Sequence, residues 1–296
     1  MQSLIHYFSN VPDGHRVLLL TVSVTLFWWL ENPALLLADS SRWHHALTNA
    51  TFVFLGAFVQ LVFGYSLLNA LNWTAHHHWG LVRLLPIAQH PLLGFVLSFL
   101  LLDLLEYTYH VLMHRYGYLW RFHAVHHADP ALDVSTVLRE HPGETAIRLA
   151  FLLVWVFISG ITFWALMARQ FVQIVSNVAA HAHLRLPERL DRVLSWLLVT
   201  PNMHQVHHHE SQPYTDSNYG DVLSIWDRLF GTFRRMQANQ LIFGLDTIRE
   251  PLNGASFGHL LRQPFGGIHT QESPANAPFP QPAPAQSVID APQSNV

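Results

Sequence analysis

The sequence predicts an all-α fold in which multi-pass membrane helices support a cytosolic, helical, histidine-rich cap that holds two metal ions. Three observations lead to this prediction. Of the 296 residues, 50% are hydrophobic and only 12% are charged, whereas charged residues make up about a quarter of a typical soluble protein. The apolar residues are concentrated in long blocks, and eight histidines form three closely spaced clusters after these blocks.

Three apolar blocks are long enough to cross a membrane. They comprise residues 17–38, 48–71 and 92–109. A membrane-spanning helix needs about 20 largely apolar residues, and each block is close to that length. A helix in the core of a soluble protein would show a polar stripe, which these blocks mostly lack. We therefore expect an integral membrane protein in which each block crosses the membrane once.

The third block continues without a helix breaker into His110 and His114. One helix is therefore expected to leave the bilayer and to carry its first two histidines just beyond the membrane surface. Three arginines follow closely, Arg115, Arg121 and Arg139. Because positive residues are enriched on the cytoplasmic side of membrane proteins, we expect the histidines in the cytoplasm and the N-terminus outside.

A fourth apolar stretch, residues 145–180, has Gly160 near its middle. The histidines before and after this stretch must meet at one site, so the chain has to return to the side of the membrane that it left. We therefore expect two legs, Thr145–Ser159 and Ile161–Ala180, that turn at Ser159-Gly160. Each leg is short for a full span, and Arg169 in the second leg favours partial entry into the membrane.

The histidine clusters carry most of the functional information. His110 and His114 form H-x-x-x-H, and the pattern H-x-x-H-H occurs twice, at His123, His126 and His127 and at His204, His207 and His208. Residues three and four apart share a helix face, so each cluster is expected to present its imidazoles in one direction. Neutral imidazole is a common ligand of iron, zinc and copper. Eight such ligands are too many for one ion and suit two ions held close together, which makes all eight candidate metal-binding and catalytic residues.

The ligand types define the chemistry that such a site could perform. The chain has no cysteine, which excludes disulfides and thiolate metal sites. Two iron ions held by imidazoles could bind dioxygen, reduce it with two external electrons and attack an unactivated C–H bond. A pair of zinc ions would instead activate water for hydrolysis. The net charge of −3 without a basic stripe gives no sign of a nucleic-acid partner.

A metal transporter or metal buffer is a third interpretation of the same histidines. The clusters lie beyond the ends of the apolar blocks, whereas a transporter needs polar ligands near the middle of the membrane. The sequence therefore disfavours transport.

The run DLLEYTYHVLMHRYGYLWRFHAVHH, the later REHPGE, and the closing segments PNMHQVHHHES and NYGDVLSIWDRLFGT resemble the fatty acid hydroxylase/sterol desaturase superfamily over roughly residues 92–235. This resemblance implies a membrane-bound non-haem di-iron oxygenase with cytosolic histidines. It would hydroxylate or desaturate a C–H bond of a lipid, using O2 and electrons from an electron-transfer protein. Zinc can replace the two iron ions on purification, since imidazole binds zinc well.

The resemblance also implies further metal ligands between the second and third clusters. His181 occupies that place, and His183 stands where the family often has asparagine. We therefore rank His181 first and keep His183 as a second candidate metal ligand. The resemblance leaves open which lipid is the substrate, and whether it is hydroxylated or desaturated, since both reactions begin with abstraction of one hydrogen.

Several residues around the ligands are candidates for supporting roles. Metal-bound imidazoles usually donate their second N–H to a carboxylate or carbonyl, so Asp103 and Glu106 are expected to orient histidines, and Tyr107 lies on the same helix face. Three residues resemble the family's R-x-H-P-x-E segment and are expected to be structural or close to the substrate: Arg139, His141 and Glu144. Five more match its C-terminal signature and are expected to close the site: Asn218, Tyr219, Gly220, Trp226 and Asp227.

The chain is expected to divide into four parts. Residues 1–91 form N-terminal membrane helices with their loops, and residues 92–240 form the catalytic domain. A C-terminal extension covers residues 241–262. Residues 263–296 are rich in Pro, Gln, Ala and Ser, and such a composition cannot bury enough apolar surface to fold, so we expect a disordered tail.

Overall fold

The computed structural model describes residues 1–31, 40–85, 90–246 and 256–266. Over these residues the fold is all-α, as predicted, with two isolated β-bridges and no sheet. The longer helices are α1 (Gln2–Ser9), α2 (Asp13–Glu31), α3 (Ser40–His76), α5 (Pro91–Arg115), α6 (Gly117–His127), α7 (Pro142–Ser159) and α8 (Phe163–His181). The shorter ones are α4 (Leu81–Leu84), η1 (Val134–Leu138), α9 (Glu188–Leu194), α10 (Pro201–His207), α11 (Ile225–Leu229), η2 (Ala238–Gln240), α12 (Phe257–Arg262) and η3 (Gln263–Phe265).

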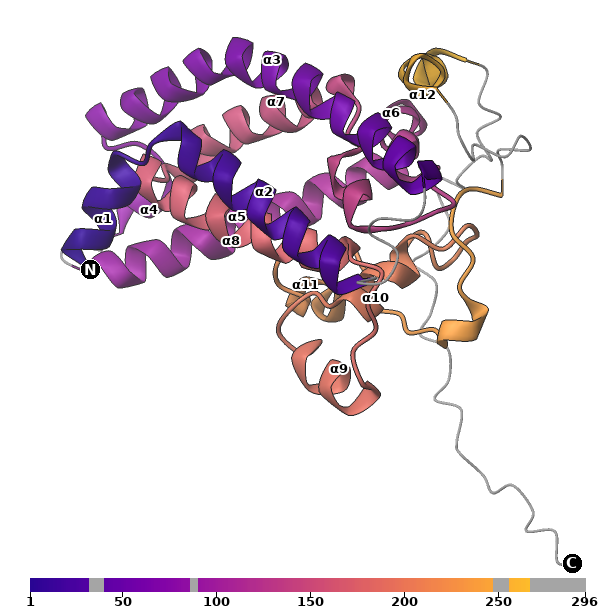
Figure 1. Cartoon of the computed structure of the whole chain (residues 1–296). Helices are drawn as coiled ribbons and strands as arrows, with labels where there is room; N and C mark the ends of the chain where they lie inside the picture. Colours follow the sequence, from indigo (N-terminus) through magenta and orange to yellow (C-terminus); the bar gives the residue numbers. More distant parts are fainter. Residues whose placement is uncertain (32–39, 86–89, 247–255, 267–296) are drawn as a thin grey trace, which may run out of the picture.

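The long helices form a bundle. Helices α9 to α12 lie beyond one end of it, whereas α4 lies at the opposite end, near α1 (Figure 1). Within the bundle, α3 packs against α7, α2 packs against α8, and α5 contacts both α7 and α8. Leu102 and Leu105 of α5 and Val156 of α7 are buried in the apolar core between these helices, together with Leu166 of α8. The arrangement brings the histidine-bearing ends of α5 and α8 together with α6 and α10.

Three segments of the described chain are long and apolar enough to cross a membrane, namely Ser41–Leu84, Pro91–Arg115 and Pro142–Ser159. This set differs from the predicted one. Helix α2, which contains the described part of the first block, is not among them. Its first turn is polar, with Asp13, Gly14, His15 and Arg16. Residues 32–38 of the block lie outside the described residues. The first leg of the expected hairpin, in contrast, is a candidate span by itself.

Helix α3 is much longer than the apolar block that predicted it. Its 37 residues extend about 55 Å at about 1.5 Å per residue, well beyond a hydrocarbon core of about 30 Å. The surplus lies partly at its N-terminal end, where Arg42 and His45 contact the loop that follows α6 and Asn49 contacts η1. The helix therefore connects the apolar bundle directly to the histidine-rich end of the protein.

The predicted turn at Ser159-Gly160 is confirmed. Helix α7 ends at Ser159, Gly160 adopts the left-handed conformation with φ of 66°, and α8 begins at Phe163. A Cβ atom on Gly160 would lie 2.3 Å from the carbonyl oxygen of Trp79. Glycine is thus needed both for the backbone conformation and for the close approach of the chain around Trp79.

The first three residues of the expected tail are helical in the structure. Gln263–Phe265 form the helix η3, which packs against α6, and the Phe265 ring contacts those of Phe122 and His141. Pro264 is buried in this contact, while Phe265 stays largely exposed. Residues 267–296 lie outside the described part of the chain.

Replacing Gly160 by alanine should destabilise the helical hairpin. The alanine Cβ would be strained at positive φ and would collide with Trp79, so we expect a loss of about 1–3 kcal/mol in the free energy of unfolding, measured by denaturant titration in detergent. Gly64→Ala is the matched control, because a Cβ at Gly64 meets nothing within 4 Å. Equal stability of the two variants would show that the turn does not depend on glycine.

Candidate metal centre

Nine histidine side chains meet at the end of the bundle. Helix α5 supplies two, α6 supplies three, α8 supplies its last residue, and α10 with the residue after it supplies three. In that order they are His110, His114, His123, His126, His127, His181, His204, His207 and His208. All eight histidines of the predicted clusters are therefore brought together, along with the favoured additional candidate His181.

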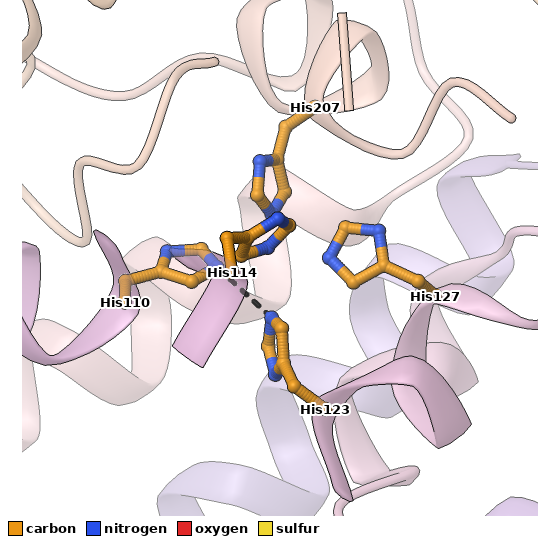
Figure 2. A group of neighbouring side chains, drawn as sticks. All are labelled: His110, His114, His123, His127 and His207. Atoms are coloured by element: carbon orange, nitrogen blue, oxygen red, sulfur yellow. Dashed lines mark hydrogen bonds between the residues drawn. The ribbon is translucent and has the colours of Figure 1, made fainter. Parts of the chain in front are cut away.

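The nine imidazoles form two groups whose candidate ligand nitrogens lie within 4.8 Å of one another. The five-histidine group consists of His110, His114, His123, His127 and His207, and its rings converge on one centre (Figure 2). The four-histidine group consists of His126, His181, His204 and His208. The groups adjoin each other, since the rings of His127 and His208 stack at a centroid distance of 4.6 Å.

Each H-x-x-H-H cluster is divided between the two groups, so our expectation that each cluster points in one direction was wrong. In α6, His123 and His127 belong to the five-histidine group, whereas His126 belongs to the four-histidine group. In α10 and the residue after it, His204 and His208 share a group and His207 joins the other. Residues four apart lie nearly above one another on a helix, while the third residue is rotated by some tens of degrees, which is enough to serve a neighbouring centre.

Six of the nine imidazoles have Nδ1 held by an oxygen acceptor. The acceptors are the backbone carbonyls of Tyr219 for His110 (3.0 Å), Arg139 for His126 (3.3 Å), Asn177 for His181 (2.8 Å) and Ser217 for His207 (2.7 Å), and the carboxylates of Asp216 for His114 (3.1 Å) and Glu144 for His123 (2.7 Å). An oxygen acceptor places the ring proton on Nδ1 and leaves a lone pair on Nε2. These partners therefore aim Nε2 inward.

The inward Nε2 atoms face one another at distances that fit a shared cation. Nε2 of His110 lies 3.0 Å from Nε2 of His123, and the same separation joins His126 and His181. Since Nδ1 carries the proton in all four rings, each contact opposes two lone pairs and is repulsive unless a cation lies between them. Adjacent ligands at right angles around one ion, at a metal–nitrogen distance of about 2.1 Å, lie about 3 Å apart.

Buried imidazole nitrogens without a hydrogen-bond partner also indicate that these residues bind a metal ion. Among the described residues, Nε2 of His114, His127 and His207 is buried without a hydrogen-bond partner. Leaving a buried polar atom unsatisfied costs about 1–3 kcal/mol, and a metal ion would remove this cost at three positions of one group. The nine residues present thus fit two transition-metal ions bound through imidazole nitrogens.

Burial keeps several of these imidazoles neutral and therefore able to bind metal. Burial lowers the pKa of His207 to about 3. Burial, followed by neighbouring imidazoles, also holds the pKa of His126, His127, His204 and His208 well below the usual range. A neutral imidazole keeps the lone pair that a metal ion needs.

The three residues that the sequence assigned to orienting histidines lie elsewhere. Asp103 accepts hydrogen bonds from the backbone of Val222 and Leu223 and from the Trp226 indole. Glu106 pairs with Arg148 at 3.2 Å, and the Tyr107 hydroxyl lies 3.0 Å from the Thr232 hydroxyl. Asp103 precedes His110 by seven residues, which places it about 10 Å away along the helix axis.

The carboxylates that do hold imidazoles are Glu144 and Asp216. Glu144 belongs to the R-x-H-P-x-E segment, which indicated a structural or substrate-proximal role. Asp216 was not predicted, because it is separated from His114 by 102 residues and no motif spacing relates the two. Burial raises the pKa of Asp216 to about 6.

The C-terminal signature contributes through its backbone and one carboxylate. Asp227 accepts hydrogen bonds from the backbone N–H groups of Tyr219 (2.7 Å) and Gly220 (2.9 Å). These bonds hold the backbone segment that contains Tyr219, whose carbonyl accepts the hydrogen bond from His110. Asn218, at positive φ, bonds the carbonyl of Met203 in α10 and so joins the same segment to the third cluster.

The structure does not bring His183 into either group. Its ring is exposed, and Nδ1 bonds the Leu132 carbonyl at 3.0 Å. His209 likewise lies apart and bonds the Gln240 carbonyl. His141 caps the N-terminus of α7 and bonds the Leu261 carbonyl. These three side chains have structural partners instead of a place among the nine.

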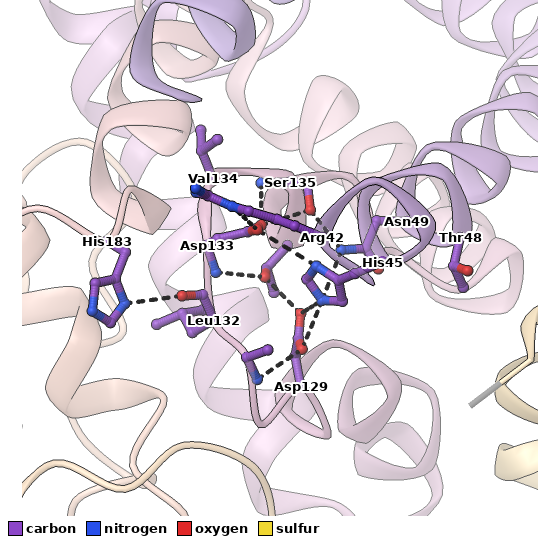
Figure 3. A network of polar contacts seen from close by, with 12 residues as sticks. Arg42, His45, Thr48, Asn49, Asp129, Leu132, Asp133, Val134, Ser135 and His183 are labelled. Atoms are coloured by element: carbon purple, nitrogen blue, oxygen red, sulfur yellow. Dashed lines mark hydrogen bonds and ion pairs between the residues drawn. The ribbon is translucent and has the colours of Figure 1, made fainter. Parts of the chain in front are cut away.

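A polar network joins the N-terminal part of α3 to the segment that follows α6 (Figure 3). Asn49 accepts from Arg139 at 2.6 Å and donates to Ser135, while Asp129 contacts His45 at 2.9 Å and Arg139 at 3.3 Å. Burial alone would raise the pKa of Asp129, but Arg139 and His45 bring it to about 2. The backbone carbonyl of Arg139 in turn accepts from His126, so the network positions a ring of the four-histidine group.

A cavity of about 80 Å³ adjoins both groups. Five of the nine histidines line it, two from the five-histidine group and three from the other. The full lining is Glu106, Tyr109, His110, His123, His126, Val137, Glu140, Glu144, Arg148, Asn177, His181, His204, Gly220 and Asp221. The cavity is therefore the space in which a substrate could reach both centres.

The fold and the site together define an all-α membrane protein with paired polyhistidine metal sites at one end of its apolar bundle. Residues 95–232 match the model of the fatty acid hydroxylase family, and this part of the chain belongs to the fatty acid hydroxylase superfamily, as the motifs predicted. The match includes all nine histidines of the two groups.

Two kinds of characterised proteins are similar to this chain. An alkylglycerol monooxygenase from Danio rerio is 32% identical over 151 residues, which is 50% of this chain and 32% of the relative. An ornithine lipid hydroxylase from Rhizobium tropici is 31% identical over 152 residues, which is 50% of this chain and 43% of the relative. The chain thus aligns with less than half the length of these relatives. No solved structure matches it.

The grouping of the histidines predicts which substitutions affect metal binding. His207→Ala should reduce occupancy of the five-histidine group and His208→Ala that of the four-histidine group, because each removes one inward-facing nitrogen. Both variants should hold fewer ions per chain than the unaltered protein, measured by inductively coupled plasma mass spectrometry. His209→Ala, the adjacent control, should keep the full content. Loss of metal from His209→Ala with retention in His208→Ala would contradict the assignment.

The polar network predicts a large effect of Asp129→Asn. The change leaves the buried Arg139 and the half-buried His45 without their shared carboxylate. We therefore expect a loss of about 3–5 kcal/mol in the free energy of unfolding, measured by denaturant titration in detergent. Glu188→Gln is the control, since Glu188 and Arg192 form an exposed pair at 3.6 Å and such pairs contribute little. Similar stabilities for the two variants would show that the network does not hold α3 to the cap.

Proposed function

We propose that this chain is a membrane-bound non-haem di-iron oxygenase that hydroxylates, or desaturates, a C–H bond of a lipid. The observation that carries the proposal is the opposed Nε2 pairs within the two histidine groups. Family membership supports it, as do the relatives whose names describe an alkylglycerol monooxygenase and an ornithine lipid hydroxylase. These names favour oxidation over the zinc-dependent hydrolysis that the same imidazoles could also support.

All nine histidines are proposed as the ligands, and the protein's own residues keep their nitrogens available. Glu144 and Asp216 hold the Nδ1 protons of His123 and His114, and backbone carbonyls hold four more. Bound iron would supply the capacity to bind and reduce dioxygen, which imidazole-ligated iron with few carboxylates supports. The burial of most of these rings excludes bulk water from the reacting oxygen.

The overall reaction requires an external reductant. In hydroxylation, one oxygen atom of O2 enters the C–H bond and the other becomes water, with two electrons and two protons consumed. In desaturation, two hydrogens leave the substrate and both oxygen atoms become water, again with two electrons and two protons. We propose that an electron-transfer protein on the same side of the membrane delivers these electrons.

Lipid profiling tests the function. Mass spectrometry of lipids from host cells that express the protein should reveal a species heavier by one oxygen or lighter by two hydrogens than its precursor. Cells that express His207→Ala should lack the product, because a ligand of the five-histidine group is missing. Identical lipid profiles with and without a protein shown to contain iron would contradict the oxygenase assignment.

We further propose that the protein crosses the membrane several times with the histidine-rich end in the cytoplasm. Ala131 and Gln212 are both exposed near this end, and the chain has no native cysteine. Ala131→Cys and Gln212→Cys should therefore both react with a membrane-impermeant maleimide only after the cells are opened. Labelling of either position in intact cells would contradict the cytoplasmic placement, and labelling of only one would contradict a common side.

A further inference from the structure

Helix α9 exposes its apolar side chains and buries a polar one. Leu190 is 46% exposed and Val193 is 70% exposed, whereas Asp191 is only 5% exposed. Asp191 accepts a hydrogen bond from the Thr200 hydroxyl at 2.6 Å and pairs with Arg235 at 3.2 Å. A helix on the surface of a soluble protein has the opposite arrangement, with its apolar side chains facing the core. The apolar side chains of α9 are therefore directed away from the protein interior.

The exposed apolar surface continues from α9 to α11. The Arg228 guanidinium lies 4.3 Å from the centroid of the Trp196 ring and donates to the Ser195 carbonyl at 2.7 Å, which joins the two segments. Single exposed apolar residues are common, but a group of neighbouring ones marks a surface that contacts another molecule or a membrane. We call this group the α9–α11 surface, and its seven exposed residues are Leu190, Val193, Trp196, Leu197, Leu198, Leu229 and Phe230.

One end of the α9–α11 surface lies beside a candidate membrane span. The Phe230 ring stacks on the Tyr107 ring of α5 at a centroid distance of 5.3 Å. Tyr107 is near the end of the apolar block at residues 92–109, where α5 is expected to leave the bilayer. Aromatic side chains with a polar group are enriched at this depth, because lipid and water meet there. The stacking therefore places Phe230 at the level of the bilayer surface, and Figure 1 shows α9 to one side of the long helices at this end.

The charges beside this surface suit lipid phosphates. Arg185, Arg189 and Arg192 are exposed, against the single exposed carboxylate of Glu188 in the same segment. Arginine side chains next to apolar residues reach from the acyl chains to the head groups and attract anionic lipids. A second copy of this chain would instead bring the same positive charges together, and like charges repel. The surface is therefore suited to a bilayer and not to self-association.

We propose that the α9–α11 surface inserts into the interfacial layer of the bilayer that α5 crosses, and that Arg185 and Arg189 contact lipid phosphates. The inference goes beyond the proposed function, because it rests on the membrane placement of α5 and not on the oxygenase chemistry. The backbone of Val222 and Leu223, just before α11, donates to Asp103 of α5. Insertion therefore holds the histidine-bearing end of α5 at a constant height above the lipid.

Fluorophore labelling in nanodiscs tests this inference, since the chain has no native cysteine. Val193→Cys and Leu229→Cys, each in the metal-loaded full chain, receive an environment-sensitive fluorophore in discs of phosphatidylcholine and phosphatidylglycerol. At both positions the emission should shift to shorter wavelength, and lipids that carry a nitroxide near the head group should quench it, because the label lies in the interfacial layer. The control is Ala131→Cys, which should stay unquenched. The Ala131 backbone bonds Asp129, which contacts the surplus N-terminal end of α3.

A label at Phe58→Cys reports the membrane placement separately, because Phe58 is 65% exposed in the apolar part of α3. Nitroxides on the acyl chains should quench this label. Unquenched emission at both Val193→Cys and Leu229→Cys with quenching at Phe58→Cys would overturn the inference alone. This holds for emission at long wavelength, from a label in water, and at short wavelength, from a label covered by another protein molecule. Unquenched emission at all three positions would contradict the membrane placement itself.

A charge reversal tests the role of the arginines. Arg189→Glu should reduce the quenching of the Val193→Cys label in discs that contain phosphatidylglycerol, because a carboxylate repels anionic lipids. Arg262→Glu is the matched control, since Arg262 is exposed on α12, outside the α9–α11 surface. Equal quenching in the two variants would overturn the assignment of lipid phosphates to Arg189.

Discussion

Neutral imidazoles with their lone pairs aimed at one another are the constraint on which the rest of this structure depends. Six of the nine rings have their Nδ1 proton committed to an oxygen acceptor, and in four of these rings the Nε2 atoms meet in pairs at 3.0 Å. Such contacts are repulsive in a bare protein and favourable around a cation. Metal binding is therefore expected to contribute to stability as well as to chemistry, because the folded chain gathers these nitrogens and an unfolded chain does not.

The surrounding fold keeps the nine rings in place through contacts between distant segments. Asp103 ties α5 to the chain around Val222, and Arg169 of α8 pairs with both Asp103 and Asp221. On the other side, the Asn49–Arg139 bond connects α3 to the carbonyl that holds His126. Each histidine group thus draws ligands from at least three elements, and two of these elements, α5 and α8, are also joined by the buried Asp103–Arg169 pair.

The sequence predicted the features that depend on local pattern. The continuous α5, the turn at Gly160 and the meeting of the histidine clusters all follow from apolar length, glycine conformation and motif spacing. Motif spacing could not predict the division of each H-x-x-H-H cluster, since this depends on where a second helix approaches. The partners of these carboxylates could not be predicted either. Asp103 and Asp216 bond residues more than a hundred positions away, and the sequence around each carboxylate does not indicate which residue it will contact.

X-ray absorption spectroscopy of the iron-loaded protein tests the central claim most directly. If Nε2 atoms of the two groups bind the ions, the absorption fine structure at the iron edge should contain a first shell of nitrogen or oxygen donors at about 2.1 Å. It should also contain the outer-shell scattering of several imidazole rings. Glu144→Gln, which weakens the hold on the His123 proton, should change this pattern more than Glu188→Gln. A first shell without imidazole scattering would contradict the account, because the ions would then lie outside the two histidine groups.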